Sequence, residues 1–214
     1  MILLIKKIIR SILHSTITSI SLFFSLNNIY TFRKYKNIFY SSLLKREFKD
    51  VGENFSIEYP FNIIGPLYIS IGNNFSSFSG LILEAHEQHL NNHYSPEIKI
   101  GDNVSFAYNC HIGCVNKIII GNNVLFASKV FVTDHFHGEI KKEFLKIPPS
   151  LRKVISKGPV IIEDNVWIGE GVAIMPNVKI GRNTIIGTNS VVTKNIPENS
   201  VVGGVPAKVI RKLE

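Results

Sequence analysis

The histidines are the residues in this sequence best suited to proton transfer or metal binding. They gather in two stretches: His86, His89 and His93 in the first, and His135 and His137 in the second. An imidazole titrates at about pH 6.5, so a histidine can take up a proton at neutral pH. His135 stands where a regular repeat breaks, beside a long polar insertion. Long insertions in compact repeats usually serve function, so we expect His135 to act as a general base rather than as a plain loop residue.

The first stretch suggests a zinc site, but its spacing argues against one. It reads H-E-Q-H instead of HExxH, and the repeat contributes no evident further ligand. We therefore expect a solvated loop there. Cys110 and Cys114 lie in an apolar segment, where packing of small side chains is the simpler interpretation. Two cysteines make no disulfide framework, which fits a reducing compartment.

A period of six residues defines the scaffold that must position these side chains. Within residues 160–194, apolar residues fall six apart: Ile162, Ile168, Ile174, Ile180, Ile186 and Val192. Asn or Gly follows three positions after each, and these residue types tolerate a left-handed backbone, so a turn recurs every six residues. The same period returns within residues 98–112 and 120–132. A hexapeptide period is typical of a parallel β-helix, with three sixes to each triangular coil.

The charge is concentrated in the N-terminal segment. Of the net charge of +8, residues 1–50 hold +7, from nine basic and two acidic residues. A repeat body so nearly neutral argues against nucleic-acid binding. Residues 11–26 are uncharged but too short and too polar for a membrane span. We expect helices within residues 1–49 that pack on the repeat or lie on a membrane surface.

These observations divide the chain into two parts. Residues 1–50 form a basic, apolar helical segment, and residues 51–214 form the β-helix. The β-helix carries a loop insertion at 136–159 and a C-terminal cap at 196–214. We expect the cap to contain a short basic helix from about Ala207 that covers the open end of the solenoid.

The order of motifs resembles the acetyl-CoA-dependent hexapeptide-repeat O-acetyltransferases. The resemblance rests on FASKVFVTDHFHG, on SKGPVIIEDNVWIGEGVAIMPNVKIG and on VVGGVPAKVIRK, and covers about residues 55–212. It implies an all-β, left-handed parallel β-helix that assembles as a homotrimer, with active sites between subunits. It also implies transfer of an acetyl group to a sugar of lipopolysaccharide or capsule.

The same resemblance assigns roles to three residues, and it makes His135 the base that deprotonates the acceptor hydroxyl. The neighbouring Asp134 would, by its position alone, either orient the imidazole or only cap a turn. It places Asn109 against the acceptor or the acetyl group, although Asn recurs at many corners of this repeat. It puts Trp167 on the wall of the cleft between subunits, where subunit packing alone would also explain it.

The resemblance further implies that CoA lies along the groove between neighbouring solenoids. The matching residues are Trp167, Gly169, Glu170, Gly187, Thr188, Thr193, Lys194, Pro206, Lys208 and Arg211. Glycines admit the pantetheine arm closely, and the cations suit its phosphates. Lys208 stands where relatives often have Arg, and the carboxylate of Glu170 does not suit a phosphate.

We therefore expect an acetyl-CoA-dependent O-acetyltransferase with no metal. It would act on a carbohydrate in the cytoplasm, at the inner face of the membrane, with membrane contact through residues 1–49 and no nucleic-acid partner. Four alternatives stay open: a zinc-dependent carbonic anhydrase-like enzyme using His111 among its ligands, transfer to an amine or antibiotic, transfer from a carrier protein, and a non-catalytic membrane scaffold.

Overall fold

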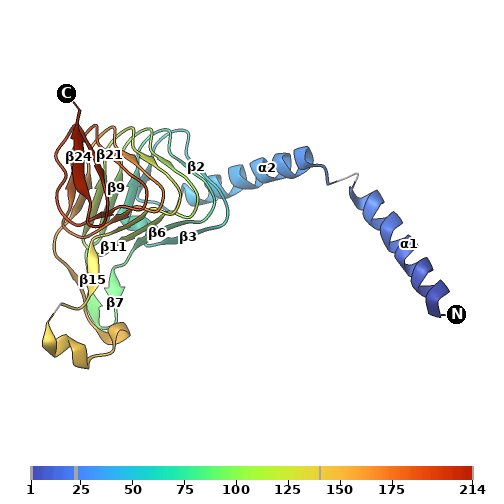
Figure 1. The fold of residues 1–214 in the computed structure, drawn as a ribbon, viewed down its shortest axis with the longest axis horizontal. Helices are drawn as coiled ribbons and strands as arrows, with labels where there is room; N and C mark the ends of the chain where they lie inside the picture. Colours follow the sequence, from blue (N-terminus) through green and yellow to red (C-terminus); the bar gives the residue numbers. More distant parts are fainter. Residues whose placement is uncertain (1, 22–23, 140, 214) are drawn as a thin grey trace. The chain divides into compact units, whose positions relative to one another are not determined.

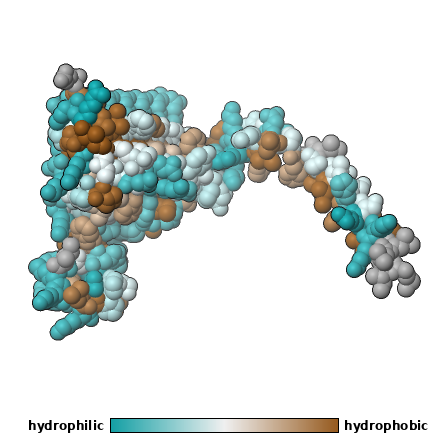
Figure 2. All heavy atoms as spheres, viewed as in Figure 1, coloured by the Kyte–Doolittle hydropathy of each residue, from teal (hydrophilic) through white to brown (hydrophobic). Residues whose placement is uncertain are grey.

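The structure is a computed structural model that describes residues 2–21, 24–139 and 141–213 in two units, 1–39 and 40–214. The first unit holds α1 (Ile2–Ser21) and most of α2 (Leu26–Leu44), as the expected N-terminal helices. Apolar side chains along α1 are exposed, among them Ile5, Ile9 and Ile12, and Figure 2 shows apolar and hydrophilic side chains together on its surface. Within the described residues no single helix is long and apolar enough to cross a membrane; α1 and α2 meet that criterion only as a bent pair.

The second unit is a three-sided parallel coil (Figure 1). Up to residue 192 the strands of the coil join the first, second and third sheets in turn, and the strands of neighbouring coils pair in parallel. The first sheet contains β1 (Asp50–Val51), β4 (Ile69–Ile71), β9 (Glu97–Ile100), β12 (Lys117–Ile120), β17 (Val160–Ile162) and β20 (Lys179–Ile180). The second contains β2 (Ser56–Ile57), β5 (Ser76–Ser77), β10 (Ser105–Phe106), β13 (Leu125–Phe126), β18 (Trp167–Ile168), β21 (Ile185–Ile186), β23 (Ser200–Gly203) and β24 (Lys208–Lys212). The third contains β3 (Phe61–Ile64), β6 (Leu81–Ala85), β11 (His111–Cys114), β14 (Phe131–Thr133), β19 (Ala173–Ile174) and β22 (Val191–Val192).

The core of the coil is the column of inward side chains that the period predicts. All six apolar positions between 162 and 192 are at most 1% exposed. Phenylalanine rings continue the column towards the N-terminal coils, from Phe126 through Phe106 and Phe75 to Phe55. Burying large apolar side chains in every coil drives the chain to close on itself.

A ladder of asparagines holds the corner between the first and second sheets. Each member has a positive φ, and each side-chain amide donates to the next coil's amide oxygen, at 2.8–3.1 Å. The members are Asn54, Asn74, Asn103, Asn123, Asn165, Asn183 and Asn199. Asn suits this corner because it tolerates the left-handed backbone and satisfies its own side chain by stacking.

The prediction of a C-terminal helix from about Ala207 is wrong. The tail forms β24, which pairs antiparallel with β23. The chain reverses in the turn at residues 204–207, where Gly204 has a φ of +99°. A helix of so few residues is marginal in water, whereas pairing satisfies the N–H and C=O groups of an open sheet edge.

Two hairpins project from the coil where the repeat is interrupted. β7 (Gln88–His89) pairs with β8 (Asn92–His93), and β15 (His135–His137) pairs with β16 (Val154–Ser156). Between β15 and β16 lie the short 3₁₀ helices η2 (Lys142–Lys146) and η3 (Pro149–Leu151); η1 (Pro66–Tyr68) lies near the start of the coil. The expected loop insertion therefore forms an arm, residues 135–156, whose two ends pair as β15 and β16, and His135 lies in β15.

Candidate active site

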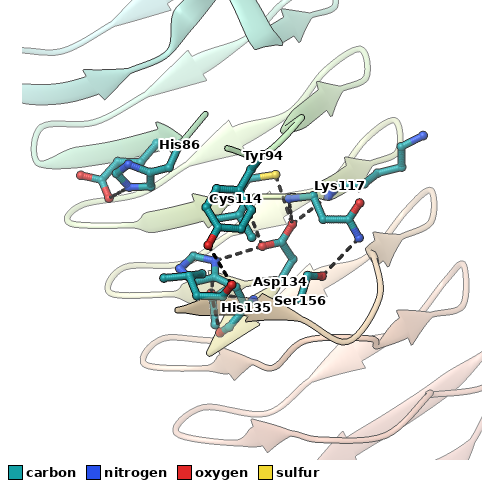
Figure 3. Close-up of polar contacts among 12 residues, drawn as sticks. His86, Tyr94, Cys114, Lys117, Asp134, His135 and Ser156 are labelled. Atoms are coloured by element: carbon teal, nitrogen blue, oxygen red, sulfur yellow. Dashed lines mark hydrogen bonds and ion pairs between the residues drawn. The ribbon is translucent and has the colours of Figure 1, made fainter. Parts of the chain in front are cut away.

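The corner after β11 is held by one buried carboxylate. Residues 115–117 turn back on themselves, and their N–H groups all point at Asp134. The distances from its carboxylate oxygens are 3.0 Å to the nitrogen of Val115, 2.8 Å to that of Asn116 and 2.7 Å to that of Lys117. Figure 3 shows this carboxylate at the centre of the polar contacts. The turn at residues 115–117, which interrupts the six-residue period, is therefore held by a residue from the next coil.

Asp134 also fixes the orientation of His135. Its Oδ1 lies 3.0 Å from His135 Nδ1, and Asp134 is fully buried. Burial by itself raises the pKa of Asp134, but hydrogen bonds from His135, from the N–H groups of Val115 and Asn116 and from Cys114 outweigh it, so the pKa lies below its usual value. An ionised carboxylate can only accept, so Nδ1 of His135 carries the proton and Nε2 is left as the basic nitrogen. Asp134 thus both orients the imidazole and holds the turn.

His135 opens into a cleft of about 400 Å³ on the outer face of the third sheet. Other lining residues are Glu84, His86, His111, Gly113 and Met175. Glu84 Oε2 lies 3.2 Å from His86 Nε2 and 3.3 Å from His111 Nε2. A base with a free nitrogen therefore faces a polar cluster across an open space, which suits proton abstraction from a bound hydroxyl.

The arm covers one end of this cleft. The ring of His137 lies 5.3 Å from that of His89 and 6.5 Å from that of His135. Burial, with the charges of His89 and His135, lowers the pKa of His137, so it is neutral at pH 7. Tyr94 donates to the carbonyl of Val154 at 2.9 Å, which ties the two hairpins together.

The zinc alternative requires three side chains that converge on one metal ion at an interface between subunits. Within residues 2–21, 24–139 and 141–213, no three His, Cys, Asp or Glu side chains are placed to hold a metal ion. His86 pairs with Glu84 instead, and His89 faces His137. Both cysteines are free and buried.

Asn109 and Trp167 lie elsewhere on the coil. Asn109 is exposed at a corner with a φ of +58°, and it does not line the cleft within this chain. Trp167 stands on the outer face of the second sheet, beside Leu125 and Ile185, and is 52% exposed. Their proposed roles therefore depend on a surface that a second subunit would supply.

Four of the predicted CoA residues share one corner of the coil. Gly169 donates to the carbonyl of Ile186 at 2.8 Å, so Gly169 and Glu170 lie directly under Gly187 and Thr188. A Cβ on Gly169 would come within 2.7 Å of that carbonyl oxygen, so only glycine fits. The carboxylate of Glu170 is paired with Lys129 at 3.0 Å, which offsets its repulsion of a phosphate.

The remaining predicted CoA residues lie around the end of the coil. Thr193 and Lys194 occupy the next corner and are exposed. Lys208 pairs with Gly203, and Arg211 with Val201, on the closing strand; Pro206 is exposed in the preceding turn. Gly187 donates to the carbonyl of Val202, so Gly203 lies one strand beyond Gly187 and Lys208, on β24, lies two strands beyond.

Sequence reasoning missed Glu84 and Gly113. Glu84 and Gly113 are directly paired on neighbouring strands of the third sheet, and Gly113 is paired in turn with Thr133. The hairpin insertion between β6 and β9 breaks the period, so their alignment could not be counted from the sequence. The one available signal was the concentration of His and Glu in residues 84–89.

Comparison with known proteins places the coil among the hexapeptide-repeat transferases. The family described as bacterial transferase hexapeptide (six repeats) matches residues 159–194. The chain is 40% identical, over 73% of its length and 78% of the relative, to WbbJ of Escherichia coli K12, named for O-acetyl transfer in lipopolysaccharide biosynthesis. It is 36% identical, over 80% of its length and 68% of the relative, to the galactoside O-acetyltransferase of the same organism. Among solved structures it matches AntD, an N-acyltransferase of Bacillus cereus in complex with dTDP-4-amino-4,6-dideoxyglucose and coenzyme A, with a TM-score of 0.66 and 27% identity over 81% of this chain and 88% of AntD.

Proposed function

Because the chain belongs to the hexapeptide-repeat acetyltransferases, we propose that it moves the acetyl group of acetyl-CoA to a hydroxyl group of a sugar. The observation that carries the proposal is the buried, ionised Asp134 on Nδ1 of His135, which leaves Nε2 free at an open cleft. A sugar hydroxyl is too weak an acid to attack a thioester unaided at neutral pH. A placed base typically contributes about 10²–10⁴ in rate.

Direct transfer needs no covalent enzyme intermediate. His135 Nε2 takes the proton as the hydroxyl oxygen attacks the acetyl carbonyl, which gives a tetrahedral oxyanion. Its collapse breaks the carbon–sulfur bond, and the CoA sulfur leaves with the proton that His135 holds. Asp134 stabilises the imidazolium formed between these steps. Acetyl-CoA is a co-substrate, and the step requires no metal.

The donor is proposed to lie along the glycine corner. Gly169 and Gly187 present bare backbone there, which suits a close approach of the pantetheine arm. Lys194, Lys208 and Arg211 are exposed near the end of this corner, where they can neutralise the phosphates.

The acceptor is proposed to be a sugar unit of a surface polysaccharide, as the name of WbbJ suggests. A second hollow of about 450 Å³ is lined by residues of the arm between Phe136 and Arg152, and it shares Phe136 and His137 with the cleft. An acceptor longer than one sugar can therefore extend from the cleft along the arm. AntD is an N-acyltransferase that binds an amino sugar, so an amine is the competing acceptor.

The proposed assembly is a homotrimer of left-handed coils, as is typical of the family. Trp167 and Leu125 expose apolar surface on the outer face of the second sheet, which a neighbouring subunit would cover. Light scattering after size exclusion should give three times the chain mass of 24.1 kDa. A monomer that retains full activity would contradict active sites between subunits.

The N-terminal segment is proposed to attach the enzyme to the inner face of a membrane. Residues 1–46 contain eight Lys or Arg and no Asp or Glu. In α1, Lys6 and Arg10 are four residues apart on one helix face, and Ile5, Ile9 and Ile12 follow the apolar period on another. The full chain should sediment with vesicles that contain phosphatidylglycerol and not with pure phosphatidylcholine. Equal binding to both would contradict an electrostatic attachment.

Thiol release from acetyl-CoA tests the reaction. Wild-type protein is assayed against a panel of methyl glycosides and oligosaccharides, with amino sugars as the competing acceptors. His135→Ala should lower kcat about 10²–10⁴-fold. The matched control is His93→Ala, an exposed histidine on β8, which should retain full rate. Equal rates for wild type and His135→Ala with every acceptor would show that His135 is not the base.

A further inference from the structure

Glu84 is the focus of a polar cluster that the proposed reaction does not use. It lies on β6, facing the cleft, and its side chain is 17% exposed. Its Oε2 is within 3.3 Å of both His86 Nε2 and His111 Nε2, and Asn62 donates to Oε1 at 2.9 Å. These contacts hold the carboxylate in one orientation. A carboxylate oxygen can accept two hydrogen bonds, so Oε1 has capacity for another donor.

Gly113 keeps the space between this cluster and His135 open. It is paired with Glu84 on one side and Thr133 on the other, so it forms a gap in a column of outward side chains. A Cβ at Gly113 would lie 3.5 Å from His135 Cε1 and 3.7 Å from His111 Nε2. A single group of atoms above Gly113 would therefore touch both imidazoles.

We propose that Glu84, held in place by His111 and with Gly113 as the floor, binds a second hydroxyl of the acceptor sugar, next to the hydroxyl that His135 deprotonates. This proposal rests on the proposed function and specifies its substrate as a sugar with adjacent hydroxyl groups. The second hydroxyl donates to Oε1 of Glu84, while the Nε2–H of His111 donates to Oε2 and holds the carboxylate in place. Two neighbouring hydroxyls fit because only Gly113 separates Glu84 and His111 from His135.

The surroundings favour a sugar ring over a smaller alcohol. The ring of Phe131 lies 5.2 Å from that of His111 and, with Phe136, lines the cleft. Aromatic walls with a few oriented polar groups are typical of sites that bind small organic ligands. The same carboxylate would also attract the ammonium group of an amino sugar. The tests of Glu84→Gln distinguish this acceptor from a sugar with adjacent hydroxyls.

The first test combines a variant with a changed acceptor. For the best methyl glycoside in the panel, Glu84→Gln should raise the acceptor KM about ten- to a hundred-fold, the worth of a hydrogen bond to a charged group, and change kcat much less. The derivative that lacks the adjacent hydroxyl should be equally poor with wild type and Glu84→Gln. Glu163→Gln, on the first sheet, is the matched control and should leave both constants unchanged.

The second test fills the floor. Gly113 has no positive φ, and the atoms nearest a new Cβ are at ordinary contact distance, so Gly113→Ala should fold with an unchanged melting temperature. It should raise the acceptor KM at least tenfold and leave the KM for acetyl-CoA unchanged. Folded Glu84→Gln and Gly113→Ala variants with wild-type KM values would overturn the proposal, as would a preference for an amino sugar that Glu84→Gln removes. If wild type acetylates no sugar at all, the proposed function itself fails.

Discussion

Replacing Asp134 by asparagine separates the two tasks of this buried carboxylate. Oδ1 accepts from His135 and Val115, whereas Oδ2 accepts from the N–H groups of Asn116 and Lys117 and from the thiol of Cys114. An asparagine has one oxygen, so its NH₂ must face one of these two sets of donors. At Oδ2 it would leave two N–H groups without an acceptor. At Oδ1 it would leave only that of Val115, because His135 can shift its proton to Nε2 and accept at Nδ1.

The second orientation costs less, and it removes the basic nitrogen from the cleft. One buried N–H without a partner costs about 1–3 kcal/mol. For a domain of this size each kcal/mol lowers the melting temperature by about 2–4 °C. Because His135 then presents a protonated Nε2 to the acceptor, kcat should fall about 10²–10⁴-fold. Asp134→Asn should therefore remain folded and be nearly inactive.

The measurements are kcat from thiol release and the melting temperature from circular dichroism. Asp164→Asn is the matched control, since Asp164 also accepts a backbone N–H, from Asn122 at 2.7 Å, but at a corner remote from His135. It should retain full kcat. A folded Asp134→Asn protein with kcat within about threefold of wild type would refute the role of Asp134 in setting the protonation of His135.

Three further predictions concern pH, stability and thiol reactivity. The pKa of His137 is lowered in the folded protein, so its contribution to stability is present above the unfolded value of about 6.5 and is lost as the pH falls through the folded value. His137→Gln should therefore reduce the fall in melting temperature between about pH 6.5 and pH 5. An unchanged pH dependence of the melting temperature would contradict this. Asn165→Ala should lower the free energy of unfolding by about 2–4 kcal/mol, because two side-chain hydrogen bonds are lost and alanine does not favour a left-handed backbone. Asn165→Gly should lower it by less, since glycine tolerates that backbone. Equal denaturation midpoints for the Ala and Gly variants would exclude the backbone contribution. Burial raises the pKa of Cys110 to about 11 and also raises that of Cys114, so neither thiol should react with a disulfide reagent at pH 8 until the protein unfolds, and rapid labelling of the native protein would contradict their burial.

The sequence alone was sufficient for the coil because its information is local and repeated. Ile162, Ile168 and Ile174 are six apart, and a period of six with Asn or Gly at each corner permits few other folds. The order of motifs likewise singled out His135, since a break in a regular repeat is visible without coordinates. The tail was predicted wrongly because its residues are compatible with a short helix. Pairing with the open edge at β23 decided its conformation, and an edge exists only once the coil has formed.

The surroundings of His135 required the tertiary structure. Glu84, His111 and His135 reach the cleft from three coils, and the β7–β8 hairpin and the turn at residues 115–117 shift the register between them, so their sequence numbers do not show that they meet. Asp134 was predicted either to orient the imidazole or to cap a turn; the fold shows that it does both, because the turn at residues 115–117 stacks directly beside it. The sequence by itself determined the scaffold and indicated His135 as the proposed base, since a repeated apolar period and the break in it are local. Only the tertiary structure decided what faces the base, since stacking of coils brings together residues that the sequence separates.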